Sequence, residues 1–170
     1  MRYQVEIEPH DDRAVISLRA SGAAVVAIEA AIGASLPGVG CSERYAKPNG
    51  VLLGVGPNEW LAVVERAQEQ HCFDELKLAS AQHHASVIVM TDGYFCSALS
   101  GADASAVLSQ VCGIDLHCDV FGDGAVARTA FAKVSAVIHC LQAGNRYEIY
   151  ADSGLRGYVC GYLEAAAGPG

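Results

Sequence analysis

The sequence VLLGVGPNEWLAVV, residues 51–64, carries the clearest structural signal of the chain. Two apolar runs, at residues 51–55 and 59–64, lie on either side of a Gly-Pro-Asn tripeptide. Apolar runs of this length form strands, and proline and asparagine fit the backbone angles of a tight turn. The stretch therefore predicts a β-hairpin, with Trp60 near the beginning of its second strand.

Strands are also predicted on both sides of this hairpin. The β-branched run at residues 85–90 predicts a central strand, because buried strands are rich in such residues. Gly144 and Asn145 predict a second tight turn between two strands. Residues 36–50 are rich in turn-forming residues, so we expect a connection there with at most a short strand. The remaining predicted strands cover residues 3–8, 14–20, 94–99, 125–132, 135–141 and 146–151.

Helices are predicted where apolar residues recur at helical spacing. The first follows Ser21, a favourable N-cap, and ends at Gly33, with Ile28 and Ile32 on its buried face. Ser153 is a second favourable N-cap, at the start of the last helix. The predicted helices span residues 21–33, 65–80, 101–112 and 153–167.

The order of these elements indicates the fold class. Each half of the chain follows an approximate order of strand, helix, two strands and helix. We therefore predict an α+β protein with two ferredoxin-like βαββα lobes, at residues 1–91 and 92–170. Together the lobes would form a single domain over residues 1–170, since a chain of this length fits one compact domain.

Composition and charge exclude several classes of protein. The formal net charge is -8 and the basic residues are dispersed, which argues against nucleic-acid binding. The N-terminus, MRYQVEIEPHDDR, is charged where a signal peptide is apolar, and no apolar run reaches the roughly 18 residues of a membrane span. The 7 cysteines are an odd number and widely spaced. We therefore expect a cytoplasmic protein with reduced thiols and no membrane contact.

No motif of the sequence predicts a catalytic, cofactor-binding or metal-binding residue. The glycine-containing stretches do not open a helix after a strand, as a nucleotide-binding loop does. Cys112, His117 and Cys118 lack the paired-cysteine spacing of zinc sites. His139 and Cys140 are neighbours in a predicted strand, so their side chains should point to opposite faces and not share a metal ion. We interpret His139 as a lone, hydrogen-bonded histidine.

Three motifs, in their order along the chain, point to a known family. They are GPNEWL at residues 56–61, LSGADASAVLSQVCGIDL at residues 99–116 and VFGDGAVARTAFAKVSAVIH at residues 120–139. These motifs resemble a hairpin, a strand-turn-helix segment and an Ala-Arg-Thr segment of the sarcosine oxidase gamma subunit family. The resemblance covers residues 51–168, although arginines common in the family are missing near Tyr94 and Asp152.

The resemblance implies both a fold and a function. The family is similar to the folate-binding, aminomethyltransferase-like superfamily. The chain would be the non-catalytic gamma subunit of a heterotetrameric, sarcosine-oxidase-type flavoenzyme that oxidatively demethylates sarcosine or a related secondary amine. It would act as a scaffold between larger alpha and beta subunits, beside a small delta subunit that carries zinc. FAD, FMN, NAD and tetrahydrofolate are likewise implied on the partner subunits and not on this chain.

If the chain is a subunit of a complex, apolar and aromatic side chains on its surface are expected to contact the larger subunits. Hydrophobic residues make up 52% of the chain and charged residues 18%, so part of the apolar surface is expected to face a partner. Arg128, in an apolar strand, would pair with an acidic group of its own chain, be solvated at a sheet edge, or bind an acidic group of a partner. The residues proposed for an interface are Trp60, Tyr94, Phe121, Arg128, Tyr158 and Tyr162.

Two other functions are compatible with the sequence. A stand-alone tetrahydrofolate or pterin binder would need an aromatic-lined pocket with one carboxylate, from Asp92 or Glu59. A small cysteine-dependent enzyme would use Cys96 or Cys118 as a thiolate with a lowered pKa.

Overall fold

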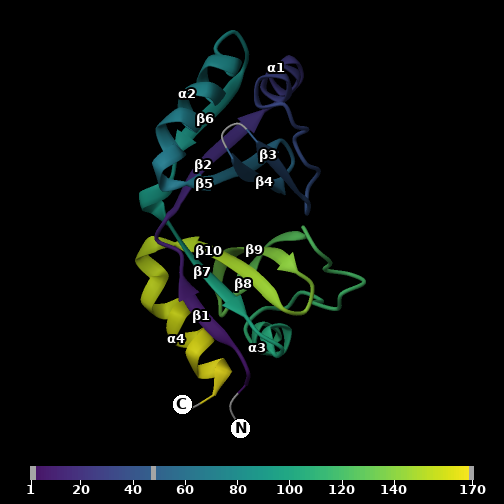
Figure 1. The fold of residues 1–170 in the computed structure, drawn as a ribbon, viewed down its shortest axis with the longest axis vertical. Helices are drawn as coiled ribbons and strands as arrows, with labels where there is room; N and C mark the ends of the chain where they lie inside the picture. The colour runs from purple at the N-terminus through teal and green to yellow at the C-terminus, as the bar shows by residue number, and fades with distance from the viewer. Residues whose placement is uncertain (1–2, 47–48, 169–170) are drawn as a thin grey trace. The chain divides into compact units, whose positions relative to one another are not determined.

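The computed structural model describes residues 3–46 and 49–168, and the chain forms two compact units (Figure 1). One unit is Asp12–Thr91, which we call the inserted unit. The other combines Met1–Asp11 with Asp92–Gly170, and we call it the terminal unit. Each unit has its own sheet and its own hydrophobic core.

The inserted unit is a 5-stranded antiparallel sheet with two helices packed on one face (Figure 1). Its elements are β2 (Arg13–Ala20), α1 (Ala23–Ile32), β3 (Ser42–Ala46), β4 (Asn49–Gly56), β5 (Glu59–Glu65), η1 (Arg66–Gln68), α2 (Glu69–Ser80) and β6 (Ala85–Val89). The strand order is β3-β4-β5-β2-β6. Ala24, Ile28 and Ile32 of α1 and Cys72 and Leu76 of α2 are buried against the sheet.

The predicted hairpin is confirmed as β4 and β5. Pro57 and Asn58 form the turn, where Asn58 has a φ of 56°, a left-handed conformation that asparagine tolerates better than most residues. Trp60 is buried, and its indole Nε1 donates a 2.7 Å hydrogen bond to the carbonyl of Pro37. This bond satisfies the polar atom that burial of a tryptophan would otherwise leave unpaired.

The terminal unit repeats this arrangement. Its elements are β1 (Glu6–Pro9), β7 (Tyr94–Ser100), α3 (Ala104–Ser109), β8 (Val126–Phe131), β9 (Val134–Gln142), β10 (Arg146–Asp152), η3 (Ser153–Leu155) and α4 (Arg156–Ala167), and η2 (Thr91–Gly93) lies at the boundary. The strand order is β1-β7-β10-β9-β8, so β1 takes the place that β6 has in the inserted unit. Because β1 pairs with β7, the start of the chain belongs to this unit, unlike in the predicted lobes 1–91 and 92–170.

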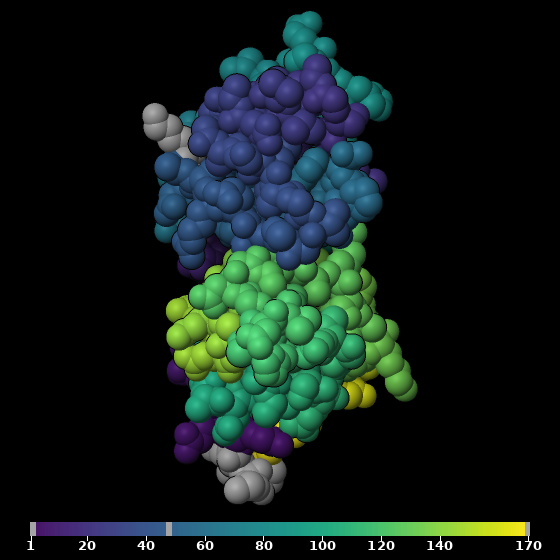
Figure 2. Space-filling model, turned by 90° about the vertical axis from the view of Figure 1, so that its right-hand side faces the viewer, coloured from purple at the N-terminus to yellow at the C-terminus, as the bar shows by residue number. Residues whose placement is uncertain are grey.

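The core of the terminal unit lies between its sheet and its two helices. Val107 and Leu108 of α3 and Val159 and Leu163 of α4 are buried against the strands. The connection between α3 and β8, green in the space-filling view, lies at the surface (Figure 2). The predicted α+β class is confirmed, and within the described residues no helix has the length and apolar character to cross a membrane.

Some details of the elements differ from the prediction. The run at residues 85–90 forms an edge strand and not a central one, and Ile88 is 51% exposed, because strand order depends on long-range pairing. Ser21 does not cap α1, whose N-cap is Gly22 without a side-chain bond. Ser153 does not cap α4 either, since its hydroxyl donates to the carbonyl of Asp92 and the N-cap is Leu155.

Gly101 allows the segment before β1 to approach the end of β7 closely. Its φ is +127°, and a Cβ at this position would lie 2.2 Å from the carbonyl oxygen of Gln4. The backbone N–H of Gln4 also donates a 2.7 Å hydrogen bond to Oδ2 of Asp103. Glycine is therefore required here both by the backbone angle and by the space.

We expect Gly101→Ala to destabilise the protein by about 2 kcal/mol or more, because it combines an unfavourable φ with a backbone clash. Urea unfolding followed by circular dichroism measures the effect. The matched control is Gly113→Ala, since Gly113 has no atom within 4 Å of an added Cβ. Equal stability of the two variants would contradict the close approach of Gln4 to Gly101.

Candidate functional site

Strand alternation places a buried carboxylate on the face of the terminal sheet that points away from its helices. In β10, Tyr147 and Ile149 belong to the hydrophobic core, so Glu148 and Tyr150 point to the opposite face. Glu148 is only 3% exposed. A buried carboxylate is costly unless hydrogen-bond donors or positive charges compensate for the water it has lost.

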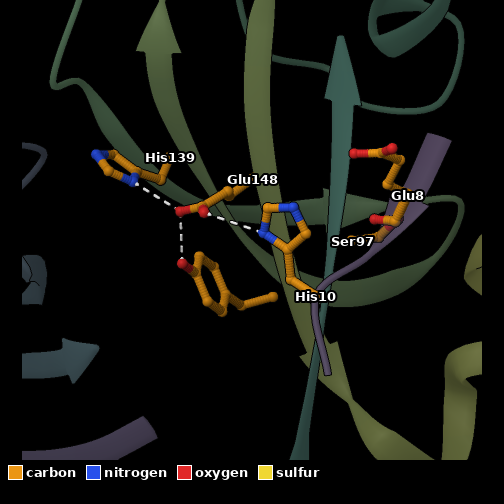
Figure 3. Close-up of polar contacts among 6 residues, drawn as sticks. Glu8, His10, Ser97, His139 and Glu148 are labelled. Carbon is orange, nitrogen blue, oxygen red and sulfur yellow. Dashed lines mark hydrogen bonds and ion pairs between the residues drawn. The ribbon is translucent and has the colours of Figure 1, made fainter. Parts of the chain in front are cut away.

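Polar side chains from three parts of the chain surround this carboxylate (Figure 3). The hydroxyl of Tyr150 donates a 2.6 Å hydrogen bond to Oε2 of Glu148. Nδ1 of His139 lies 3.4 Å from the same oxygen. Nδ1 of His10 lies 3.4 Å from the other oxygen, Oε1. Both oxygens of Glu148 therefore have a polar neighbour of the terminal unit.

The sheet register explains how these side chains meet. His139 of β9 is the direct partner of Glu148 in β10, and Tyr150 is two residues further along the same strand. His10 directly follows β1, and its backbone amide donates a 2.9 Å hydrogen bond to the carbonyl of Cys96 in β7. The Cys96 residue in turn pairs with Tyr150. The site thus combines residues from both ends and the middle of the chain.

The arrangement has two kinds of chemical capability. Glu148 with two histidines can hold or exchange a proton within a site of low water content. His10, Cys96 and Glu148 also offer a nitrogen, a sulfur and an oxygen ligand whose atoms lie within 4.8 Å of one another. A second set, His117, Cys118 and Asp119, meets the same distance limit but is exposed.

The sequence analysis missed Glu148 and His10 as site residues. The one available signal was a glutamate inside the apolar strand sequence YEIYA, where it had to face either solvent or a polar partner. His10 gave no signal, because its position beside Cys96 depends on the pairing of β1 with β7. His139 is hydrogen-bonded and lies on the face opposite to Cys140, as expected, but it is not a lone histidine, because it shares Glu148 with Tyr150 and His10.

The residues predicted for an interface belong to both units. Trp60 belongs to the inserted unit, and Phe121 of the terminal unit is buried with its ring stacked on Tyr147, 6.5 Å between centroids. Tyr94 is half-buried at the start of β7, and Arg128 is exposed on the edge strand β8. Tyr158 and Tyr162 of α4 are 38% and 43% exposed, with ring centroids 4.7 Å apart.

The carboxylates proposed for folate binding have different surroundings. Glu59 forms a 3.4 Å ion pair with Arg19 and lines an open cleft of about 440 Å³ in the inserted unit, beside His84. Asp92 is exposed, and its carbonyl accepts the hydrogen bond from Ser153.

The seven cysteines differ in burial, and Cys160 is intermediate. Cys72, Cys96, Cys112 and Cys140 are buried, whereas Cys41 and Cys118 are exposed. Burial raises the pKa of Cys72 to about 11. Burial, and then the charge of Asp123, raise the pKa of Cys140 to about 11. These two thiols are therefore poor nucleophiles near neutral pH.

A family model matches most of the chain, and solved structures share its fold. Residues 18–168 match the sequence profile of the family described as sarcosine oxidase, gamma subunit family. The fold is similar to a structure of heterotetrameric sarcosine oxidase from Corynebacterium sp. U-96, with 24% identity over 96% of this chain and 83% of the other and a TM-score of 0.86. No curated protein sequence matches the chain.

Two further solved structures share the fold at lower identity. The glycine cleavage system aminomethyltransferase T from Bartonella henselae has 16% identity and a TM-score of 0.71, covering 95% of this chain and 46% of that protein. The regulatory subunit of aspartate kinase from Thermus thermophilus has 12% identity and a TM-score of 0.52, over 98% of this chain and 99% of the other. At these identities the likeness concerns the fold alone.

We expect Tyr150→Phe to lower the free energy of unfolding by about 1.5–3 kcal/mol, because it removes a hydrogen bond to a buried carboxylate. Urea unfolding at pH 7 measures the loss. Tyr162→Phe is the matched control, since it removes the hydroxyl of a tyrosine that is 43% exposed. A Tyr150→Phe protein as stable as the control would show that the short bond to Glu148 contributes nothing.

Native-state alkylation should distinguish the cysteines. At pH 8, a thiol with a pKa of about 11 has about one molecule in a thousand as thiolate, so Cys72 and Cys140 should stay unmodified by iodoacetamide. Cys41 and Cys118 should react, because they are exposed. Peptide mass spectrometry with and without urea reads out each site. Rapid labelling of Cys72 or Cys140 in the folded protein would contradict their burial.

Proposed function

The chain belongs to the sarcosine oxidase gamma subunit family, and we propose that it is a non-catalytic scaffold in a heterotetrameric flavoenzyme that oxidatively demethylates sarcosine or a related secondary amine. The observation that carries this proposal is the family match over residues 18–168, which includes most of both units. A match confined to one unit would be compatible with a single module that this chain has in common with the family. A match over both units indicates that the chain resembles the family's subunit over nearly its whole length.

A scaffold role fits the chemistry of the Glu148 site. The oxygens of Glu148 have Tyr150, His139 and His10 as neighbours, all from the same sheet or its direct continuation. The contacts of Tyr150 and His139 with Oε2 of Glu148 help to hold β9 and β10 together. On this proposal FAD, FMN, NAD, tetrahydrofolate and the zinc of the delta subunit are bound by the partner subunits.

The tyrosine pair of α4 is the part of the proposed interface that has the most suitable surface. Tyr158 and Tyr162 are exposed and in ring contact, and the Tyr158 hydroxyl donates to the carbonyl of Ala132. This bond fixes one ring before a partner binds, which reduces the entropy lost on association. Tyrosines are also frequent among the residues that dominate interface energies. Trp60 and Phe121 are buried and offer little surface.

A stand-alone folate or pterin binder is the second candidate. It is favoured by the cleft of the inserted unit, which Glu59 lines together with Arg19 and His84. Titration of the full chain with tetrahydrofolate, followed by tryptophan fluorescence, tests it. Saturable binding by the isolated chain would favour this candidate over the scaffold.

Co-expression with the genes of the other subunits tests the scaffold function. The chain should elute with the larger subunits in size exclusion, at a fixed stoichiometry and with the flavin absorption of the complex. The proposal fails if the other subunits form an active, yellow enzyme without this chain while it elutes alone.

We expect Tyr162→Ala to weaken assembly of the complex about 10-fold or more, since interface tyrosines often contribute more than 1.4 kcal/mol. Tyr162→Phe keeps the ring and should assemble nearly as well as the wild type. Analytical ultracentrifugation of the mixed subunits measures both. If the Tyr162→Ala variant assembles as well as the wild type, α4 is not part of the interface. The scaffold function is then tested by the co-expression experiment alone.

A further inference from the structure

Three potential metal ligands of different chemistry converge next to Oε1 of Glu148. His10, Cys96 and Glu148 come from the end of β1, from β7 and from β10, and their ligand atoms lie within 4.8 Å of one another. We propose that these three side chains bind a divalent cation of the zinc class, with a water molecule as the fourth ligand. Zinc prefers this mixture of imidazole, thiolate and carboxylate, whereas magnesium and calcium prefer oxygen ligands alone.

The distances agree with a tetrahedral site. In zinc sites the ligand atoms lie about 2.0–2.3 Å from the metal, which puts them roughly 3.3–3.6 Å from one another. Nδ1 of His10 and Oε1 of Glu148 are already 3.4 Å apart. Small side-chain rotations would bring the Cys96 sulfur within the same range, because all three atoms lie inside 4.8 Å.

The imidazole of His10 is the observation that points most directly to a bound group. Its Nδ1 atom is buried and makes no hydrogen bond within the part of the chain described here. Nδ1 lies 3.4 Å from Oε1 of Glu148, but the geometry is not that of a hydrogen bond. A lone pair on a buried nitrogen that faces a thiol and a carboxylate is suited to a cation. The His10 side chain is 15% exposed, which leaves an access path for the ion.

The neighbours of Glu148 orient it for this role. Tyr150 donates to Oε2, and His139 lies beside the same oxygen, whereas Oε1 lies on the side of His10 (Figure 3). Hydrogen bonds to the outer oxygen of a ligating carboxylate are common around protein metal sites and fix its direction. The cation would therefore link the residue after β1 to β7 and β10. Binding releases the proton of the Cys96 thiol to solvent, so the affinity should rise with pH.

The test uses the purified full chain, stripped with a chelator and titrated with Zn²⁺ against a competing chromophoric chelator. We expect one equivalent of Zn²⁺ to bind. Cys96→Ser and His10→Asn should each weaken the affinity about 100-fold or more, since mutation of residues that only hydrogen-bond to metal ligands already lowers metal affinity 10–100-fold. Cobalt should give thiolate-to-metal absorption in the near ultraviolet. The matched control is Cys118→Ser, which removes the sulfur of the exposed second cluster and should bind as the wild type does.

Three results would overturn the site: no binding, binding lost in Cys118→Ser but retained in Cys96→Ser, or equal binding in all variants. Circular dichroism shows whether Cys96→Ser folds. If it does not, the site is tested instead with the cobalt spectrum of the double variant His10→Asn/Cys118→Ser. Loss of the thiolate absorption there supports the site, and its persistence overturns it. These results are independent of subunit assembly, so failure of the metal site would not affect the proposed scaffold function.

Discussion

The pairing of β7 with β1 on one side and β10 on the other is the constraint on which the terminal unit depends. It joins the beginning, the middle and the end of the chain in one antiparallel sheet. Side-chain alternation then gives that sheet an apolar face under α3 and α4 and a second face that carries Cys96, Glu148 and Tyr150. Without β1, the sheet would lose an edge strand and the Glu148 site would lose His10.

Burial of Glu148 sets the second constraint. A carboxylate that is 3% exposed must be compensated by neighbours, and the chain supplies a tyrosine hydroxyl and two imidazoles. A network of this kind specifies one register of strands, because a shift by one residue would turn every member to the other face of the sheet.

The two units have the same strand order with different chain connectivity. In the inserted unit the edge strand next to β2 is β6, which follows α2, whereas in the terminal unit the equivalent strand β1 comes from the start of the chain. This connectivity means that the inserted unit begins and ends at the terminal unit. The family match over residues 18–168 therefore includes the whole inserted unit from Leu18 onward and most of the terminal unit.

The sequence by itself determined the elements whose signals are local. The β4–β5 hairpin follows from Gly56, Pro57 and Asn58, and the C-terminal hairpin from Gly144 and Asn145, because turn geometry depends on a few adjacent residues. The α+β class followed from the order of such segments, and the resemblance to the family from three sequence motifs at residues 56–61, 99–116 and 120–139. Only the tertiary structure decided that β6 is an edge strand, that β1 pairs with β7 and that His10, Cys96 and Glu148 meet. These outcomes depend on which strands pair across long stretches of chain, and periodicity within a strand contains no information about its partner.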